Sequence, residues 1–264
     1  MQFTLTLPSN NSLTYYPTNT ASSFTTKLPE DINLIGQWEI ALKEIQYPIT
    51  WYNIEGNQGH ITIDFNSVTS PIVLQALTTV LTERMAIKAY IRSGYYSTGQ
   101  QLIDEINHML RAALPPSLGQ AIHFSYSIPS GKFTVDIGYG ITVKLSLKLA
   151  RMMGFKSIMK IPQQGNRAAD LKRGIYSLYV YCDACEESIV GDTKVQLLRI
   201  VPIMGEQGDY VCRTYDFPTY TPVQTKNFGD IKILITDDTG AEIPFRSGKS
   251  IVILHFRRKG FALQ

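Results

Sequence analysis

Alternating apolar and polar positions predict strands toward both ends of the chain. In residues 3–7 (FTLTL) every second residue is apolar, as expected for a strand with one buried face. Alternation, or short runs of β-branched and aromatic residues between turn-forming residues, predicts further strands at residues 23–28, 38–47, 60–65, 175–182, 195–203, 231–236 and 251–256. About eight strands of this kind fit a two-sheet, all-β sandwich or jelly roll.

The strand predicted at residues 38–47 changes phase part-way along. Its apolar positions are even-numbered as far as Leu42 and odd-numbered from Ile45 onward. One extra residue in the strand would return the later side chains to the buried face. We therefore expect a β-bulge near Lys43 or Glu44.

The middle of the chain has a different periodicity. After a capping sequence at Ser97–Gln100, apolar residues recur at helical spacing from Leu102 to Leu114, and two prolines end the predicted helix. A hairpin is predicted at residues 122–137, and a short helix at Ser146–Met153, with Gly154 as the residue that ends it.

These patterns predict a mainly β fold: a single jelly-roll β-sandwich with an inserted small α+β unit. We expect residues 1–84 and 166–264 to form one discontinuous jelly-roll domain. Residues 85–165 are expected to form the α+β insertion.

Composition indicates a folded chain and excludes several classes of partner. Of the 264 residues, 44% are hydrophobic and 18% are charged, which is too apolar for a disordered chain. The formal net charge of +3 is too small to imply long-range attraction to nucleic acid. The longest strictly aliphatic run, Ile251–Leu254, is far shorter than the roughly 20 residues of a spanning helix, so we expect no membrane association.

Cysteine content and the first residues predict the compartment of synthesis. Three cysteines cannot form a disulfide framework, and residues 1–10 lack the charged and apolar regions of a secretion signal. We therefore expect the chain to be made in a reducing compartment.

The sequence Cys182-Asp183-Ala184-Cys185 could form a redox pair or half of a zinc site. A thioredoxin-type pair should open a helix, whereas this one ends a predicted strand. Zinc would need two further ligands, and Cys212 and His255 are distant single candidates. We interpret the two cysteines as ordinary residues at a strand end.

The sequence Ser247-Gly248-Lys249-Ser250 is similar to the end of a phosphate-binding loop. Such a loop needs an earlier glycine at the position of Ile243, and a helix after the lysine rather than the strand predicted here. We interpret this segment as a hairpin turn.

The remaining polar residues give no pattern typical of catalysis. His60, His108, His123 and His255 are scattered, and neither a Gly-x-Ser-x-Gly sequence nor a recognisable carboxylate pair is present. We therefore predict no catalytic, cofactor-binding or metal-binding residues.

Two surface features could contribute to binding. Arg257-Arg258-Lys259 could contact nucleic acid, although such a trio more often solvates a strand end. Tyr15, Tyr16, Tyr47, Trp51 and Tyr52 could form a stacking platform for bases or sugars, although core packing and subunit contacts are the commoner use of aromatic residues.

Long ordered segments of both flanks also resemble a known family. Residues 7–54, together with GIYSLYVYCD, VQLLRIVPI and residues 237–258, resemble the penton, or minor capsid, proteins of Polinton (Maverick) elements and the related adintoviruses. The similarity covers most of residues 5–65 and 174–259.

The resemblance implies a structural role without catalytic residues. It implies a single jelly roll that forms homo-pentamers at the fivefold vertices of an icosahedral virion, beside a double-jelly-roll major capsid protein. It further implies weak contact with packaged DNA, and assembly inside the host cell, in the nucleus. Five copies close a ring only through a heterologous contact between two different faces of the subunit.

Two other classes of function remain open from the residues. One is a β-sandwich module that binds carbohydrate or protein through the aromatic region Tyr47–Tyr52. The other is a redox enzyme built on Cys182 and Cys185, which would need an acidic thiol or bound zinc.

Overall fold

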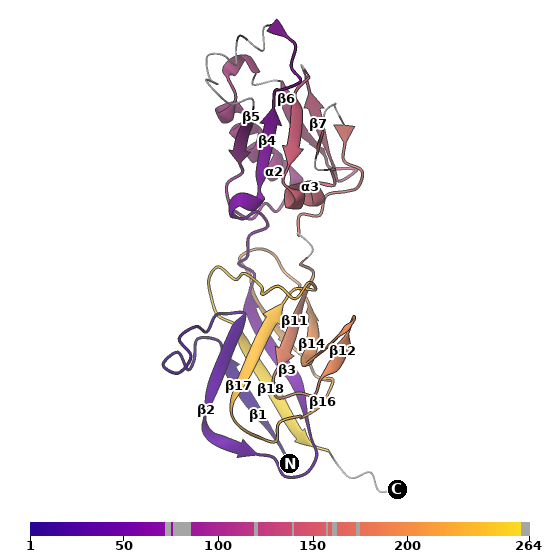
Figure 1. Ribbon diagram of the computed structural model, residues 1–264. Coiled ribbons are helices and arrows are strands. Elements are labelled where there is room, and N and C mark those ends of the chain that lie inside the picture. The colour runs from indigo at the N-terminus through magenta and orange to yellow at the C-terminus, as the bar shows by residue number, and fades with distance from the viewer. Residues whose placement is uncertain are drawn as a thin grey trace. The chain divides into compact units, whose positions relative to one another are not determined.

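A computed structural model describes residues 1–71, 75, 86–118, 121–138, 140–156, 158–159, 163–172 and 175–259. The chain divides into two compact units (Figure 1). The first contains residues 1–51 and 175–264, and the second contains residues 52–174.

The first unit consists of two four-stranded antiparallel sheets and two short additions. One sheet has the strand order β1 (Gln2–Pro8), β18 (Ile251–Arg258), β3 (Trp38–Pro48) and β15 (Tyr210–Thr214), and β16 (Thr221–Pro222) also pairs with β3. The other has the order β14 (Leu197–Pro202), β11 (Ser177–Cys182), β17 (Asn227–Thr236) and β2 (Ser23–Asn33). The short strands β12 (Ser188–Val190) and β13 (Thr193–Val195) form a separate ribbon.

This strand order is that of a jelly roll. Among the eight long strands taken in chain order, the first pairs with the last, the second with the seventh, the third with the sixth and the fourth with the fifth. A long hairpin wrapped around a barrel produces this nested pairing. The predicted jelly-roll sandwich is therefore confirmed.

The interior of the sandwich is filled by apolar side chains from both sheets. The fully buried residues include Ile40, Leu42, Leu254 and Phe256 from one sheet, and Leu178, Val180, Ile231 and Ile233 from the other. Alternation along each strand directs these side chains inward. The fold thus rests on close packing between the two sheets.

The predicted bulge in β3 lies at Lys43. In the ladder with β18, Ile253 pairs with Glu44 and the next residue, Leu254, pairs with Leu42. Lys43 therefore has no partner in this ladder and is exposed, while Leu42 and Ile45 are both fully buried. The bulge explains the change of phase in the sequence.

The second unit combines two small sheets with two α-helices in its described residues. One sheet has the order β5 (Ala86–Tyr90), β4 (His60–Asp64), β8 (Thr142–Leu145) and β9 (Ile158–Met159), and the other has the order β10 (Gln163–Gln164), β7 (Lys132–Ile137) and β6 (Ile122–Ser127). The helices are α2 (Gly99–Ala113) and α3 (Leu147–Met153), and short 3-10 turns lie at Gly56–Gln58 and Pro116–Leu118. Ile63, Ile106, Phe133 and Met153 are all fully buried in its separate core.

The structure divides the chain at positions other than those expected after residues 84 and 165. The strand predicted at residues 60–65 was expected in the jelly roll, but β4 pairs with β5 and β8 in the second unit. The insertion therefore begins at residue 52 and ends at residue 174. Alternation showed that β4 is a strand but could not show which sheet it joins, because the pairing is non-local.

The start of α2 also differs by one residue from the expected cap. Thr98 is the N-cap, and its Oγ1 accepts a hydrogen bond of 3.2 Å from the backbone N–H of Gln101. The side chain of Gln101 in turn accepts from the backbone N–H of Ser97 at 3.0 Å. The capping sequence is thus Thr98–Gln101 rather than Ser97–Gln100.

Candidate functional site

Cys182 and Cys185 lie in a tight turn at the end of β11. Both the backbone N–H and the thiol of Cys185 donate to the carbonyl oxygen of Cys182, at 3.2 and 3.1 Å. The side-chain amide of Gln196 donates to the carbonyl oxygens of Asp183 and Cys185 at 2.8 and 3.1 Å. The cysteines therefore belong to a turn that is tied to the segment before β14.

Burial makes both thiols of this turn poor nucleophiles. It raises the pKa of Cys182 well above its ordinary value and that of Cys185 to about 11. A redox pair needs the opposite, a thiol that ionises near neutral pH. The redox alternative depends on such a thiol, so this geometry argues against it.

The other candidate zinc ligands lie away from this turn. Cys212 is exposed on β15, and His255 lies on β18 in the same sheet, whereas Cys182 belongs to the opposite sheet. Within the described ranges, no group of three or more His, Cys, Asp or Glu residues is arranged to hold a metal ion.

The segment Ser247–Ser250 contains a bend, but it is not the hairpin turn predicted for it, because the preceding strand β17 and the following strand β18 lie in different sheets. Gly248 has a φ of +85°, and a side chain there would approach the ring of Pro48 to 2.9 Å. The backbone N–H of Ser250 donates to Oγ of Ser9 at 3.0 Å, and Ser9 donates back to the carbonyl of Ser250 at 2.9 Å. These bonds hold the segment against the end of β1, and the chain then continues into the strand β18 rather than into a helix.

His60 and His255 lie at separate places, whereas His108 and His123 line the same groove. His60 makes a 2.7 Å contact with the carbonyl oxygen of Asn57, and His255 lies 2.8 Å from the hydroxyl of Tyr220. Burial, together with the charges of Lys43 and Arg257, lowers the pKa of His255. His108 and His123 line an open groove between α2 and β6.

Asn107 fixes the wall of that groove. Its amide group donates to the carbonyl of Phe124 at 2.8 Å and accepts from the N–H of the same residue at 3.1 Å. A buried side chain thus satisfies backbone groups of the edge strand β6. This role could not be predicted, because Asn107 occupies an ordinary position in the helical pattern of the sequence.

The basic trio at the end of β18 is largely paired. Arg257 donates to Glu39 at 2.8 Å, and its guanidinium lies 3.4 Å from the centre of the Tyr220 ring. The ammonium of Lys259 lies 3.9 Å from the same glutamate. This arrangement fits the solvation of a strand end better than a nucleic-acid site.

The five aromatic residues proposed as a stacking platform do not form one. Tyr47 and Trp51 are buried in the core of the jelly roll, and Tyr52 belongs to the other unit. Tyr16 donates to Asp230 at 2.6 Å, which raises the pKa of Tyr16, and Tyr15 is 69% exposed. The binding-module alternative requires exposed aromatic rings in the region Tyr47–Tyr52. Because Tyr47 and Trp51 are buried, these two rings cannot stack on a ligand.

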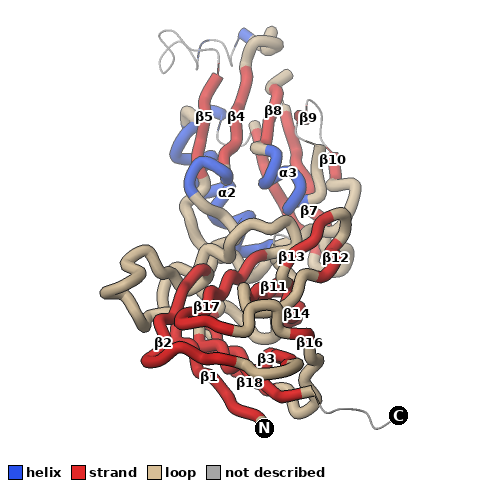
Figure 2. The backbone as a smooth tube through the Cα atoms, turned by 60° about the horizontal axis from the view of Figure 1, so that its bottom comes forward, coloured by secondary structure: helices blue, strands red, loops and turns tan. Residues whose placement is uncertain are grey.

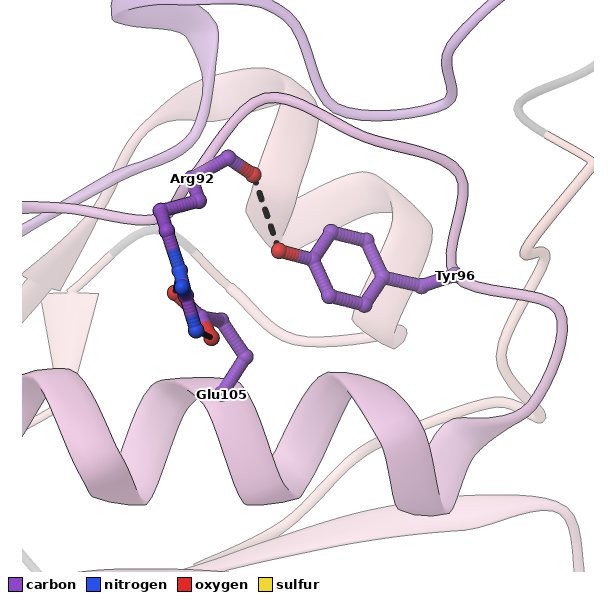
Figure 3. Close-up of polar contacts among 3 residues, drawn as sticks. All are labelled: Arg92, Tyr96 and Glu105. Atoms are coloured by element: carbon purple, nitrogen blue, oxygen red, sulfur yellow. Dashed lines mark hydrogen bonds and ion pairs between the residues drawn. The ribbon is translucent and has the colours of Figure 1, made fainter.

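A polar cluster in the second unit holds the chain before α2 against that helix (Figure 3). Arg92 donates to both carboxylate oxygens of Glu105, at 2.8 and 2.6 Å, and the hydroxyl of Tyr96 donates to the carbonyl of Arg92 at 2.8 Å. The hydrogen bond from Arg92 lowers the pKa of Glu105, while burial and then the charge of Glu105 raise the pKa of Tyr96 to about 12. At neutral pH the carboxylate is ionised and the phenol is protonated, which suits a structural clamp.

No protein-family model matches the chain, and no curated protein matches it. Among solved structures, the mavirus penton protein matches with a TM-score of 0.49 and 11% identity, over 97% of this chain and 98% of that one. A chain of the Sputnik virophage structure matches with a TM-score of 0.44 and 11% identity, over 98% of each chain.

Among the residues that the structure covers, no helix is long and apolar enough to cross a membrane.

The motifs considered from the sequence lie in turns, in the core or among paired surface charges. What remains is the outer surface of the jelly roll, where several large apolar side chains are exposed.

Proposed function

We propose that this chain is a structural capsid protein: a penton, or minor capsid, subunit that forms pentamers at the fivefold vertices of an icosahedral virion. The strand order of the two sheets carries the proposal, because eight-stranded jelly rolls of this kind build viral capsids. The resemblance of residues 5–65 and 174–259 to Polinton and adintovirus penton proteins supports the same role and that family.

The filled interior favours this role over the other uses of the jelly roll. Lectins and cupins share the architecture but use a ligand or metal site. Here the large side chains between the sheets, among them Phe24, Tyr47 and Phe256, are fully buried in one core. A subunit that acts through its outer faces needs an interior of this kind and no active site.

The proposal includes the partners and the location that the resemblance implies. The pentamer would lie beside a double-jelly-roll major capsid protein and make weak contact with packaged DNA. The protein would act in the virion, after assembly in the nucleus of the host cell.

The oligomeric state of the purified full chain tests the proposal. We expect native mass spectrometry and negative-stain images to show closed rings of five, either for the protein alone or after mixing with the major capsid protein of the same element. A chain that stays monomeric in both conditions would contradict the proposal. Binding of glycans in an array, without rings, would favour the binding-module alternative instead.

A further inference from the structure

β1 is the outermost strand of its sheet, and among the described strands it pairs only with β18 (Figure 2). At one end, the backbone N–H of Ser9 donates to the carbonyl oxygen of Ser250 at 2.9 Å. At the other end, the N–H of Arg258 donates to the carbonyl oxygen of Met1 at 3.0 Å. Because backbone groups alternate along a strand, those of the odd-numbered residues point toward β18. The groups that point away from the sheet belong to the even-numbered residues Gln2, Thr4 and Thr6.

The outward groups of β1 have no hydrogen-bond partner within the described residues. Neither a second strand nor a described loop or side chain bonds to the outer side of residues 2–6. Gln2, Thr4 and Thr6 are exposed, so the described chain leaves this edge open to solvent. Each of these residues offers one backbone donor and one backbone acceptor. The edge therefore has the pattern of groups to which another β-strand pairs.

The apolar side chains of β1 are less completely buried than those of β18 beside it. Leu254 and Phe256 of β18 are fully buried. Phe3 and Leu5, which pair with them in the ladder, pack against the same core but are only partly buried. β1 is the last described strand of its sheet, so no neighbour covers these two side chains from the outer side. A strand added beyond β1 would cover them if its inward-facing residues were apolar.

The edge of β2, the outermost strand of the opposite sheet, is protected by a loop. Asn19, in the loop after β1, accepts from the backbone N–H of Thr25 and donates to its carbonyl oxygen, each at 2.9 Å. Oγ of Ser12 accepts from the backbone N–H of Lys27 at 3.0 Å. Side chains thus occupy backbone groups that a further strand would need.

Other edge strands carry charged residues or a proline, which also discourage strand pairing. β14 contains Arg199 and ends at Pro202, and β15 contains Arg213. In the second unit, β5 contains Lys88, and Asn107 occupies backbone groups of the edge strand β6. β1 differs from these strands, because it has no charged residue, its one proline is its last residue, and its ladder with β18 has no bulge.

A separate extended segment fits this edge better than a second folded copy does. Among the described residues, β1 is the one jelly-roll edge without such protection, so two copies could pair strands here only through β1 of each. That contact is isologous and ends at two copies, whereas a ring of five needs contact between two different faces. The strands within the described ranges are already paired in the sheets of their own chain. The added strand therefore comes from a different polypeptide.

We propose that the outer edge of β1 binds an extended segment of a neighbouring shell protein as a further strand of the sheet. The backbone groups of Gln2, Thr4 and Thr6 form hydrogen bonds with the main chain of that segment. Its inward-facing side chains are apolar and cover Phe3 and Leu5, and it has no proline at the paired positions. This inference rests on the proposed function and names the site at which the subunit binds its partner in the shell.

Thr4→Pro in the full chain tests the contact. It removes an outward N–H that the fold does not use, and an edge strand tolerates proline at such a position. In co-sedimentation with the major capsid protein of the same element, the concentration for half-maximal binding should rise at least about tenfold. Thr4→Val keeps the N–H and is the matched control, with an expected change of less than about twofold. Gln2→Pro, at the first residue of the strand, should act in the same direction as Thr4→Pro.

Hydrogen exchange of single amides identifies the residues that bind. In the wild-type chain, the amides of Thr4 and Thr6 should exchange at least about tenfold more slowly after mixing with the major capsid protein than in the protein alone. Both tryptophans, Trp38 and Trp51, lie in the jelly-roll unit, so an unchanged tryptophan fluorescence spectrum shows that each variant is folded.

Three outcomes would contradict the inference. Co-assembly in which Thr4 and Thr6 gain no protection, and in which Thr4→Pro and Thr4→Val behave alike, would overturn it and leave the proposed function standing. Protection that rises with concentration in the protein alone would show that a second copy occupies the edge, and would also overturn it. A chain that never assembles, alone or with its major capsid protein, would overturn both.

Discussion

The backbone N–H of Tyr215 donates a hydrogen bond of 2.8 Å to the carbonyl oxygen of Lys43, the bulged residue of β3. The bulge separates β15, which pairs with residues 44–48 of β3, from β16, which pairs with Glu39 and Ile40. The loop that carries Phe217 leaves the sheet between these two pairings. A single extra residue in β3 thus sets both the direction of its later side chains and the position of that loop.

Deleting Lys43 should unfold the jelly-roll unit. Without the extra residue, one half of β3 must turn its apolar side chains, such as Ile45 and Tyr47, toward solvent. We expect the free energy of unfolding to fall by at least about 4 kcal/mol. Both tryptophans, Trp38 and Trp51, lie in this unit, so urea unfolding followed by tryptophan fluorescence reports on it alone.

Lys43→Ala is the control for that deletion. It keeps the number of residues and removes only an exposed side chain, so a change within about 0.5 kcal/mol is expected. Equal destabilisation by the two variants would show that the side chain, rather than the bulge, is important.

The three thiols should differ in reactivity. All three thiols have raised pKa values, that of Cys212 through partial burial and the nearby Glu44 carboxylate, but only Cys212 is exposed to a reagent, whereas Cys182 and Cys185 are buried. At pH 8, we expect an aromatic disulfide reagent to modify one thiol quickly and the other two only after unfolding. Cys212→Ser should abolish the fast phase, and a fast phase that is lost in Cys185→Ser instead would revive the redox alternative.

The clamp between Arg92 and Glu105 should make the second unit sensitive to acid. Arg92 lowers the pKa of Glu105 in the folded protein below the value that this carboxyl group has in the unfolded chain. The ion pair therefore stabilises the fold fully above the unfolded pKa, and this stabilisation is lost as the pH falls through the folded pKa. At pH 7, Glu105→Gln should reduce stability by about 1 kcal/mol, and at about pH 2 it should have no effect.

Hydrogen exchange of the amides in α2 measures this effect. Asp104→Asn is the matched control, an exposed carboxylate on the same helix that accepts from Gln100 at 2.8 Å rather than from an arginine. A pH-independent effect of Glu105→Gln would indicate lost packing rather than a lost ion pair.

Two deletions should distinguish the boundaries of the insertion. Replacing residues 52–174 by a short Gly-Ser linker removes one whole core and should leave a folded jelly roll with buried tryptophans. Removing only residues 85–165 leaves β4 without its partners β5 and β8, and exposes Ile61 and Ile63. We expect the second protein to aggregate, and equal solubility of the two would contradict the structural division.

Local features were predictable from the sequence, and pairings between distant segments were not. The bulge at Lys43 follows from the strict two-residue period of a strand, whereas the hairpin turn predicted at Gly248 was wrong because β17 and β18 join different sheets. The membership of β4 in the second unit depends on β5 and β8, which are far away in sequence. Alternation is the same in either sheet, so it could not place this strand.

The surface residues were the least predictable part of the molecule. Tyr47, Trp51 and Phe217 are all aromatic residues near turns, yet two are buried and one is 95% exposed. Exposure depends on which segments cover a side chain, and that is a property of the complete fold. Arg199 likewise stands between apolar residues in the sequence, and its position there gives no indication of the ring of Tyr215 beside it.

The attachment of Asn19 to Thr25 bears on the behaviour of the free protein at high concentration. The side-chain amide of Asn19 occupies both backbone groups of Thr25, so a strand of another polypeptide cannot pair with β2 at this position. Aggregation by strand addition is therefore blocked at this point of the edge.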